Sequence, residues 1–221
     1  MVNELGAKRL GLSLRIANAE KYFEERDAIS HDWYQFMSKT LPEISWLLLP
    51  NLGSDIVGYL QKWDIDSVIL TGGNDLGSAP RRDETENSIL NFAIQKKIPV
   101  FGICRGLQVI QNYYGREVRP HNSNLHVGKE HLIQLTQSEF VPKGLDQEYE
   151  VNSFHNFGVR KDELADGLEP IALTTDGEWV EGLIHKQHRV GGIQWHPERK
   201  EKNPDLSHKL IRSFFALKGE Q

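Results

Sequence analysis

The sequence predicts an α/β fold in which a mostly parallel central sheet is flanked by helices. Strand-like and helix-like segments alternate four times in the first half of the 221-residue chain, a pattern typical of parallel βα units. The second half is richer in turns and β-favouring residues, which indicates a smaller antiparallel β portion. No internal repeat and no low-complexity linker separates the two halves. We therefore expect residues 1–221 to form a single domain.

Four strands are expected in the first half, each a short apolar or alternating run. They are Arg9–Arg15, Ile44–Leu49, Ser67–Thr71 and Ile98–Ile103. The stretch from Ile16 to Ser30 is charged and lacks strong periodicity, so we expect a loop there.

Four helices are expected around these strands, because apolar residues recur at spacings of three and four. Asp32 caps the first helix, which stops near Pro42, and the third helix carries acidic residues in its first turn. The helices run from Asp32 to Leu41, from Gly53 to Trp63, from Arg81 to Lys97 and from Leu107 to Tyr114.

The second half is expected to contain five strands and one helix. The strands are Glu130–Thr136, Glu148–Asn152, Pro170–Thr175, Trp179–His185 and Arg189–Gln194. The pair Asp176-Gly177 predicts a hairpin turn between the third and the fourth of them. Leu206, Leu210 and Phe214 lie on one face of a final helix from Asp205 to Leu217.

Composition argues against several classes of function. The net charge of -5 disfavours a nucleic-acid binder, which would carry a basic excess. A single cysteine excludes intramolecular disulfides and cysteine-cluster metal sites, and it favours a reducing compartment. The first residues have no apolar signal core, and no window reaches the roughly 18 apolar residues of a membrane span. We expect a cytoplasmic protein without a membrane or nucleic-acid partner.

The one cysteine lies at the junction of a predicted strand and a predicted helix. Cys104 has Gly102 and Gly106 two residues to either side, as in the G-x-S-x-G elbow with sulfur in place of oxygen. A side chain at such a turn stands at a helix N-terminus, where unpaired N–H groups favour the thiolate. A lone cysteine is also an ordinary small core residue, and the elbow pattern alone leaves both interpretations open.

A base for this sulfur is offered by His196-Pro197-Glu198. Of nine histidines, only His196 is followed two positions later by a carboxylate in a stiff setting. Pro197 biases His196 toward extended backbone, and residues two apart in an extended chain point the same way, so Glu198 can hold the imidazole. By itself the segment is better explained as a polar loop after an edge strand. Together with the cysteine elbow, it predicts a nucleophile, a base and an orienting acid.

Hydrolysis of an amide also needs donors for the oxyanion. One is the backbone N–H of Arg105, which follows the cysteine. The second is expected at Gly73, where a strand ends in a glycine pair that can turn its amide into a pocket. A glycine pair at a strand end is also common as a plain turn.

Four motifs resemble those of class I glutamine amidotransferases in order and spacing. They are Gly72-Gly73-Asn74-Asp75, Gly102-Ile103-Cys104-Arg105-Gly106-Leu107-Gln108, Val151-Asn152-Ser153-Phe154-His155 and Gly192-Ile193-Gln194-Trp195-His196-Pro197-Glu198. More narrowly, the chain is similar to stand-alone γ-glutamyl hydrolases of the peptidase C26 type. The resemblance implies a flavodoxin-like sheet, with Cys104 as the nucleophile, His196 as general base and acid, and Glu198 as the residue that orients it.

The resemblance also implies which residues meet the substrate. Gly73 and Arg105 supply the oxyanion amides. Gln108 faces the glutamyl group, and Ser153 and His155 line the pocket for its α-amino and α-carboxylate ends. The full set of implied substrate-binding residues is Gly72, Asn74, Gln108, Asn152, Ser153 and His155. The alternatives are an exposed helix residue for Gln108 and a satisfied loop histidine for His155.

The leaving group is less well defined by the sequence. Phe157 replaces a glutamine that is usual in γ-glutamyl-γ-aminobutyrate hydrolases, and Leu76–Arg82 replaces their tyrosine-bearing loop, so a γ-aminobutyrate conjugate is disfavoured. Cations near the motifs suit an anionic, phosphate-bearing leaving group, although solvated loop charges are the simpler explanation. These cations are Arg81, Arg82, Arg105, His126, Lys129 and His131. The chain is further similar to a subgroup from capsule and lipopolysaccharide loci, which implies γ-glutamyl-CDP-amidate as substrate.

The leading hypothesis is a cysteine hydrolase that forms a γ-glutamyl thioester and releases L-glutamate from a small conjugate. The alternatives are a glutaminase subunit that passes ammonia to a synthase partner, and a catalytically silent binding module. His121, His126 and His131 recur every five residues, a period that fits neither one helix face nor one strand face, so we expect no metal. No nucleotide fingerprint is present, so we expect no cofactor, and the sequence leaves a homodimer open.

Overall fold

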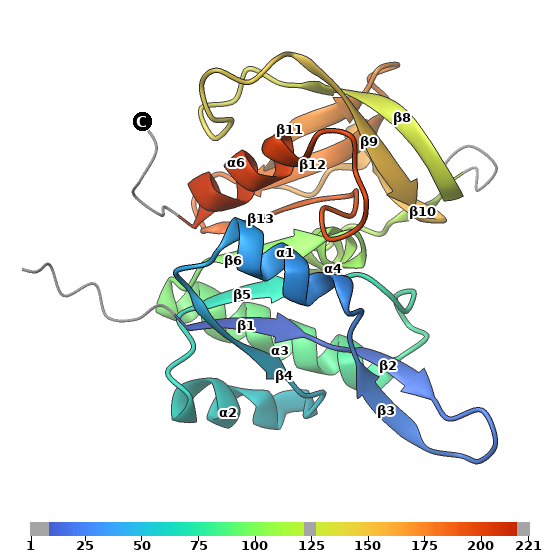
Figure 1. Ribbon diagram of the computed structural model, residues 1–221, viewed down its shortest axis with the longest axis vertical. Helices are drawn as coiled ribbons and strands as arrows, with labels where there is room; N and C mark the ends of the chain where they lie inside the picture. The colour runs from blue at the N-terminus through green and yellow to red at the C-terminus, as the bar shows by residue number, and fades with distance from the viewer. Residues whose placement is uncertain (1–8, 122–126, 216–221) are drawn as a thin grey trace, which may run out of the picture.

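The structure is a computed structural model that describes residues 9–121 and 127–215. Its main sheet begins with five strands that run parallel to one another (Figure 1). In spatial order they are β4 (Ser45–Leu49), β1 (Arg9–Ser13), β5 (Ser67–Leu70), β6 (Val100–Ile103) and β13 (Val190–Ile193). β5, β6 and β13 are buried along their whole length, because both faces of a parallel sheet are covered. The predicted parallel sheet is confirmed.

Four antiparallel strands extend the same sheet beyond β13 and confirm the smaller antiparallel portion. They are β12 (Trp179–His185), β11 (Leu168–Thr174), β8 (Val127–Leu135) and β9 (Glu148–Phe154). A side branch joins β10 (Phe157–Arg160) to β12 and to the short β7 (Arg119–Pro120). The predicted turn between β11 and β12 is closed by the Gly177 N–H, which donates to the Thr174 oxygen at 2.8 Å.

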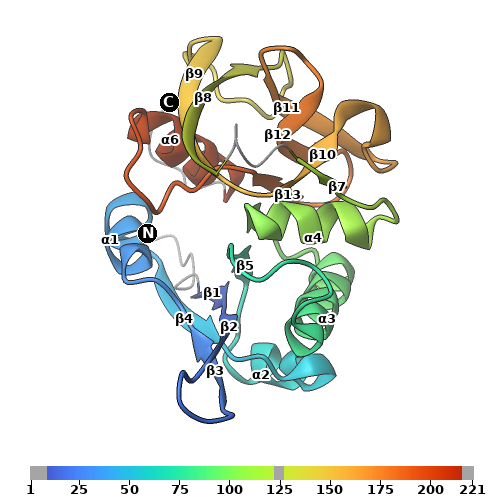
Figure 2. The same ribbon diagram turned by 90° about the vertical axis from the view of Figure 1, so that its right-hand side faces the viewer.

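Helices cover both faces of the parallel strands (Figure 2). On one face lie α1 (Asp32–Thr40) and α6 (Pro204–Phe214), and on the other lie α2 (Ile56–Lys62), α3 (Pro80–Lys96) and α4 (Arg105–Tyr113). Two short 3-10 helices, Gly53–Asp55 and Lys161–Glu163, precede α2 and follow β10. One hydrophobic core is buried beneath α1 and α6, and a second beneath α2, α3 and α4. The molecule therefore has three layers, helix on sheet on helix.

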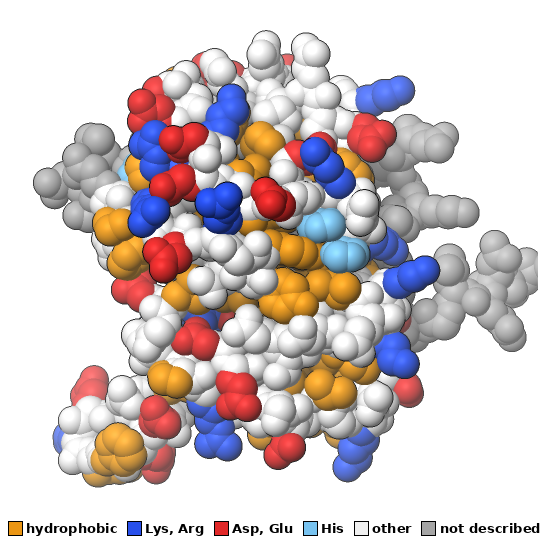
Figure 3. All heavy atoms as spheres, turned by 180° about the vertical axis from the view of Figure 1, so that it is seen from behind, with side chains coloured by type: hydrophobic (Ala, Val, Ile, Leu, Met, Phe, Trp, Pro, Cys, Tyr) orange, Lys and Arg blue, Asp and Glu red, His pale blue; other side chains and the backbone are white. Residues whose placement is uncertain are grey.

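The stretch from Ile16 to Ser30, predicted as a loop, contains a β-hairpin instead. Its strands, β2 (Arg15–Asn18) and β3 (Glu25–Ala28), form a separate two-stranded sheet. The hairpin stands out from the body of the molecule (Figures 1 and 3), and its tip carries Tyr22 and Phe23, 58% and 94% exposed. Because both strands are largely exposed, they have no need of the apolar alternation that marks a half-buried strand. The short strands β7 and β10 were not predicted either.

Two side chains fix this hairpin to the main body. Asn74, in the loop after β5, accepts from the backbone N–H of Ile16 and donates to its oxygen, both at 2.9 Å. Asp27 of β3 accepts from the backbone and side-chain N–H groups of Asn51, which follows β4, at 2.9 and 2.6 Å. Each strand of the hairpin is thus tied to a loop at the carboxyl ends of the parallel strands.

The other predicted elements are present with shifted ends. Leu14 separates β1 from β2, and the third predicted helix begins at Pro80, one residue early. β8 and β9 are longer than expected. The predicted end of the last helix at Leu217 lies outside the described residues. No helix in the described ranges is both long and apolar enough to cross a lipid bilayer.

The parallel strands bring three distant loops to one edge of the sheet. Ile193 at the end of β13 pairs with Ile103 at the end of β6, and β5 lies on the other side of β6. The chain after these strands carries Gly72, Cys104 and His196. Ligands of open α/β sheets bind at the carboxyl ends of the strands, so this edge is where a site is expected.

Candidate active site

Cys104 stands in a sharp turn between β6 and α4. Its backbone has φ 53° and ψ -107°, a strained region for a non-glycine residue that costs about 1–3 kcal/mol. Glycine neighbours make this turn possible. A β-carbon on Gly102 would lie 2.3 Å from the carbonyl carbon of Gly106, and one on Gly106 would lie 2.2 Å from the oxygen of Leu70. The turn that the glycine spacing predicted is present, with the sulfur at the N-terminus of α4.

His196 follows β13, and its imidazole is buried beside Cys104 and Glu198. Nδ1 of the ring lies 2.6 Å from Oε1 of Glu198. Burial acts to lower the pKa of His196, but the charges and hydrogen bonds of Cys104 and Glu198 outweigh it and raise the pKa to about 10. The raised pKa favours the charged form of the imidazole, which Glu198 orients through Nδ1.

Two neighbours determine where the His196 ring lies. A β-carbon on Gly72 would be 2.7 Å from Cε1 of the ring, so glycine leaves the room that the ring occupies. Asn152 holds the His196 backbone, because Oδ1 accepts its N–H at 2.8 Å and Nδ2 donates to its oxygen at 2.9 Å. The sequence predicts substrate contacts for Gly72 and Asn152. In the structure both residues lie next to His196, and their substrate contacts stay a prediction.

The predicted oxyanion donors lie on two loops at this edge of the sheet. Arg105 is the first residue of α4, so its backbone N–H has no acceptor inside the helix. Gly73 has φ +111°, which side-chain-bearing residues rarely adopt. The oxygens of Thr71 and Gly72 accept from Nη2 of Arg82 at 2.7 and 3.1 Å. The Arg82 guanidinium thus fixes the backbone of the glycine turn through these two hydrogen bonds.

Arg82 and Arg105, which the sequence places near the leaving group, belong to a buried ion cluster. Nε of Arg82 lies 3.0 Å from Glu86, and the Arg105 guanidinium pairs with both Glu86 and Asp83. Burial lowers the pKa of Arg82, an effect that Glu86 opposes. Both guanidiniums are therefore occupied in supporting the loops of the site, and the idea that they are solvated loop charges is wrong for these two residues.

The remaining cations and histidines that the sequence singled out do not gather at one place among the described residues. Arg81 and Lys129 are exposed, and His126 lies outside the described residues. The ring of His121 packs against that of Trp179, with 3.8 Å between their centroids. Within the ranges that the structure describes, no group of three or more histidine, cysteine or acidic side chains is arranged to hold a metal ion.

Gln108 and His155, predicted to meet the glutamyl group, share one carbonyl where α4 meets β10. Nε2 of Gln108 donates to the Phe157 oxygen at 2.9 Å, and Nδ1 of His155 lies 3.0 Å from the same atom. Both side chains are buried, as is Ser153 in β9, whose hydroxyl has no hydrogen-bond partner among the described residues. Asn74, predicted with them, is used instead to anchor the β2–β3 hairpin.

Two buried residues at the site had no predicted role. Nε2 of Gln194 lies 3.8 Å from the Cys104 sulfur and can donate to a thiolate. Gln194 lies within the motif Gly192–Glu198, so its place in that motif is the sequence feature that could have indicated a role at the site. Glu181 of β12 lies behind two histidines, with Oε1 3.4 Å from Nε2 of His131 and 3.8 Å from Nε2 of His155. Burial acts to lower the pKa of His131, but Glu181 raises it above its usual value. A single glutamate in a strand gives no sequence signal for such a role.

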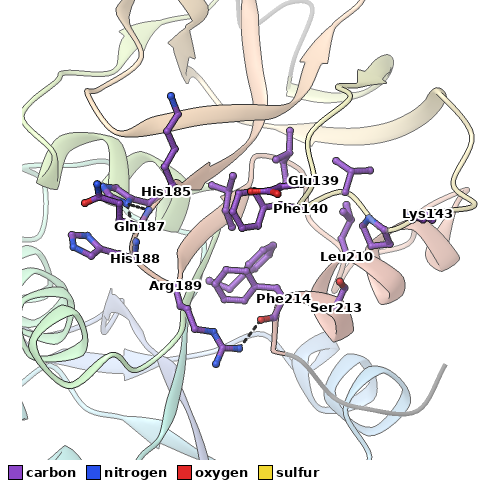
Figure 4. A pocket seen from close by; sticks show the side chains of 16 residues that line it. Glu139, Phe140, Lys143, His185, Gln187, His188, Arg189, Leu210, Ser213 and Phe214 are labelled. Atoms are coloured by element: carbon purple, nitrogen blue, oxygen red, sulfur yellow. Dashed lines mark hydrogen bonds between the residues drawn. The ribbon is translucent and has the colours of Figure 1, made fainter. Parts of the chain in front are cut away.

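A separate pocket of about 350 Å³ lies between α6, the turn from β12 to β13, and residues 139–143 (Figure 4). Phe140 and Phe214 contribute apolar surface to it, and Arg189 donates to the Phe214 oxygen at 3.1 Å. His185 and His188 stack at its side with their ring centroids 4.2 Å apart. None of the predicted site residues lines this pocket, so it is distinct from the candidate active site.

Comparison with known proteins links this site to a family. A family model for glutamine amidotransferase class-I matches residues 46–216. The chain is 30% identical over 214 residues to the γ-glutamyl-CDP-amidate hydrolase of Campylobacter jejuni, which covers 94% of this chain and 98% of that protein. It is also 30% identical over 183 residues to a GMP synthase of Ehrlichia ruminantium, covering 80% of this chain and 32% of that protein.

Solved structures share the fold at lower identity. A protein from Thermoplasma acidophilum, described as a putative GMP synthase subunit, has a TM-score of 0.70 at 19% identity, over 96% of this chain and 94% of that one. A glutamine amidotransferase from Thermotoga maritima has a TM-score of 0.65 at 14% identity, over 95% and 96% of the two chains. These likenesses show that the whole α/β architecture is shared.

Proposed function

The chain belongs to the class I glutamine amidotransferase family, and on this premise we propose that it is a cysteine-dependent hydrolase of small γ-glutamyl conjugates. It cleaves the γ-glutamyl amide bond through a thioester on Cys104 and releases L-glutamate. The observation that carries the proposal is the continuous contact from Glu198 through His196 to Cys104, with the pKa of His196 raised to about 10.

In the first step, the Cys104 thiolate attacks the γ-carbonyl carbon of the substrate. The charge that develops on the carbonyl oxygen is met by the backbone N–H groups of Gly73 and Arg105. The protonated His196 gives a proton to the amide nitrogen as the C–N bond breaks, and the amine leaves. The glutamyl group remains on the sulfur as a thioester.

In the second step, a water molecule attacks the thioester carbonyl. His196, now neutral, takes a proton from the water, and the C–S bond breaks to give L-glutamate and the thiolate. Glu198 keeps the proton on Nδ1 and stabilises the imidazolium, as the 2.6 Å contact supports. Gln194 donates to the sulfur while it is charged.

The glutamyl part of the substrate is assigned to the side of Cys104 where Gln108, Ser153 and His155 lie. The buried hydroxyl of Ser153 is a donor and acceptor for the α-amino or α-carboxylate end. Glu181 lies 3.8 Å from His155 and orients its imidazole. These contacts support recognition of a glutamyl group, independently of what its γ-carbonyl is attached to.

For the specific substrate we propose γ-glutamyl-CDP-amidate, in capsule phosphoramidate synthesis. The support is the Campylobacter jejuni relative, whose name states this substrate and which matches this chain over nearly the full length of both proteins.

A glutaminase subunit that supplies ammonia to a synthase partner is the second candidate, since the relatives include a GMP synthase of Ehrlichia ruminantium and a GMP synthase subunit of Methanococcus vannielii. The chain spans 32% of the former but 98% of the hydrolase, which favours the stand-alone hydrolase. A silent binding module is disfavoured, because it has no chemical need for the contact of Glu198 with His196.

The test is glutamate release from γ-glutamyl-CDP-amidate, γ-glutamylmethylamide and free glutamine, with the wild type and Cys104→Ser. We expect the wild type to hydrolyse the conjugates faster than glutamine, and added hydroxylamine to trap the thioester as γ-glutamyl hydroxamate. Turnover of glutamine alone would favour the glutaminase. Full activity of Cys104→Ser would overturn the mechanism.

A further inference from the structure

A cavity of about 290 Å³ opens beside His196 on the side of the β2–β3 hairpin. Its wall comes from three parts of the chain. The hairpin and the segment that leads into α1 supply residues between Arg15 and Trp33, the glycine turn supplies Thr71 to Gly73, and the loop after β13 supplies residues up to Arg199. The family model matches residues 46–216, so the first part of the wall lies outside the matched span and the other two lie within it.

This cavity lies on the leaving-group side of the scissile bond. The nitrogen that leaves must lie close to the acid that protonates it, and that acid is His196 in the proposed mechanism. His196 lines the cavity, whereas Gln108, Ser153 and His155 on the glutamyl side do not. Cys104 does not line the cavity, but Gly72 does, and a β-carbon on Gly72 would lie 3.5 Å from Cβ of Cys104. An amine part that extends from the carbonyl carbon past His196 therefore enters this cavity.

Two arginines make the cavity positively charged. Arg15 forms no ion pair with any residue that the structure describes, and Arg199 is held with its guanidinium carbon 4.2 Å from the ring centroid of Phe154. Among the described lining residues the one carboxylate is Glu198, whose Oε1 is 2.6 Å from His196 and 4.0 Å from Nε of Arg199. The charge balance of the cavity therefore favours an anionic occupant.

The strand that carries Arg15 is anchored beside the glycine turn. Its Cβ lies 3.1 Å from the position that a β-carbon on Gly73 would occupy, so the side chain starts next to the glycine turn. Ile16, the next residue, is hydrogen-bonded in both directions to Asn74, whose Oδ1 also accepts from Arg82 at 3.2 Å. The anchored strand thus fixes where the Arg15 side chain begins, next to the glycine turn and the cavity.

We propose that Arg15 and Arg199 form an anion subsite for a phosphoryl group attached to the scissile nitrogen of the substrate. The inference rests on the proposed function, whose leaving group is a phosphoramidate, and adds the residues that recognise its phosphoryl group. Guanidinium groups bind phosphate oxygens through paired N–H donors. The subsite also explains how a chain with a net charge of -5 receives an anionic substrate, since the positive charge is local.

The experiment compares two substrates in each variant, γ-glutamyl-CDP-amidate and the neutral γ-glutamylmethylamide. The quantity measured is the ratio of kcat/KM for the first to kcat/KM for the second. We expect this ratio to fall about tenfold or more in Arg15→Gln and in Arg199→Gln, because each loses charge-assisted hydrogen bonds to phosphate. Arg116→Gln, at an exposed arginine after α4 that does not line the cavity, is the matched control and keeps the wild-type ratio. An unchanged ratio in both cavity variants overturns the subsite.

Pyrophosphate binding to the Cys104→Ser protein, measured by calorimetry, separates this inference from the proposed function. Adding Arg15→Gln is expected to weaken pyrophosphate binding about tenfold or more, and adding Arg116→Gln is not. If no γ-glutamyl amide is hydrolysed but Arg15→Gln still abolishes pyrophosphate binding, the hydrolase proposal fails and the anion subsite stands. If the conjugates are hydrolysed while neither the ratio nor the binding responds to Arg15→Gln and Arg199→Gln, the subsite fails and the hydrolase stands.

Discussion

The side chain of Asn152 closes a pair of hydrogen bonds with the backbone of His196, accepting from its N–H at 2.8 Å and donating to its oxygen at 2.9 Å. Asn152 lies in β9, whereas His196 follows β13, and three other strands separate β9 from β13 in the sheet. The antiparallel part of the sheet therefore holds a residue of the parallel part in position.

Replacing Asn152 with alanine removes both hydrogen bonds and frees the His196 loop. We expect kcat to fall about tenfold or more, since misplacing a catalytic group costs rate, while KM for a γ-glutamyl conjugate changes little. Steady-state kinetics measures both constants. A raised KM with an unchanged kcat would instead indicate that Asn152 binds the substrate directly.

Replacing Gly72 with alanine puts a β-carbon where only 2.7 Å separates it from Cε1 of His196. The ring must move, and a displacement of this kind lowers kcat/KM by about 10²-fold. Gly58→Ala, in the middle of α2 with no atom within 4 Å of the new β-carbon, is the control. It keeps the wild-type activity and stabilises its helix by about 0.5–1 kcal/mol, which thermal unfolding measures.

Replacing Glu198 with glutamine removes one of the two charges that raise the pKa of His196 to about 10. We expect the pKa of His196 to fall and kcat to drop by about 10²- to 10⁴-fold, because the ring loses its orienting partner. NMR titration of the imidazole follows the pKa directly. Cys104→Ala is expected to lower it as well, since Cys104 is the larger of the two raising influences. A pKa that stays near 10 in both variants would contradict the assignment.

The raised pKa of His196 also predicts how stability depends on pH. A base that binds its proton more tightly in the folded state than in the unfolded state, where its pKa is 6.5, stabilises the fold fully below that pH. This stabilisation is lost as the pH rises toward about 10. We expect His196→Gln to have a lower free energy of unfolding than the wild type at low pH, and the difference to shrink as the pH rises. Urea unfolding across this range measures it. A deficit that does not depend on pH would exclude the charged imidazole.

Replacing Arg82 with methionine leaves Glu86 with a single guanidinium partner and releases the oxygens of Thr71 and Gly72. Breaking a buried ion pair in this way is expected to lower the free energy of unfolding by about 3–5 kcal/mol. Arg119→Met, which breaks the exposed pair with Glu163, is the control and is expected to have little effect. Urea denaturation measures both, and equal losses would argue against a special role for the buried cluster.

Glu201 gives a second pH signal of the same sign, in a lower pH interval. Burial raises its pKa to about 8, with a smaller contribution from Glu198, although a hydrogen bond from Ser207 opposes them. Between its ordinary pKa of 4.5 and about 8, the folded state holds a proton that the unfolded state has released, so stability falls as the pH rises. Glutamine does not titrate, so in Glu201→Gln this fall in stability with rising pH is absent. The variant should gain stability relative to the wild type as the pH rises through this interval, measured by urea unfolding, and a constant difference would contradict the shift.

Much of the fold and the reactive centre follows from short-range patterns in the sequence. The glycines around Cys104 and the stiff segment from His196 to Glu198 are local signals, and so are the buried strands. The hairpin at Arg15–Ala28 was not predicted, because strands exposed on both faces need no apolar alternation. The burial of Arg82 was not predicted either. Its partners are Glu86, four residues on in the same helix, and the backbone oxygens after β5, and a cation in a polar run has the same local pattern whether it is solvated or enclosed.

Other residues were predicted at the site but with different contacts. Asn152 and Asn74 lie within recognisable motifs, and in the structure each closes two hydrogen bonds with a single distant residue. A motif records that an amide is required at a position, but it does not say whether the amide meets a ligand or another part of the chain. Only the coordinates distinguish these two uses.

The pairing of β13 with β6 has a consequence for the order in which the molecule assembles. Gln194 and Cys104 are 90 residues apart in the chain, and they meet only when these two strands have joined. Closing so long a loop is entropically costly, so parallel pairing of distant segments is slow compared with the formation of local helices. In a partly folded chain, His196 therefore reaches the sulfur of Cys104 only after this pairing has formed. In a refolding experiment, recovery of hydrolysis reports this last closure, and it should lag behind the recovery of helical circular dichroism.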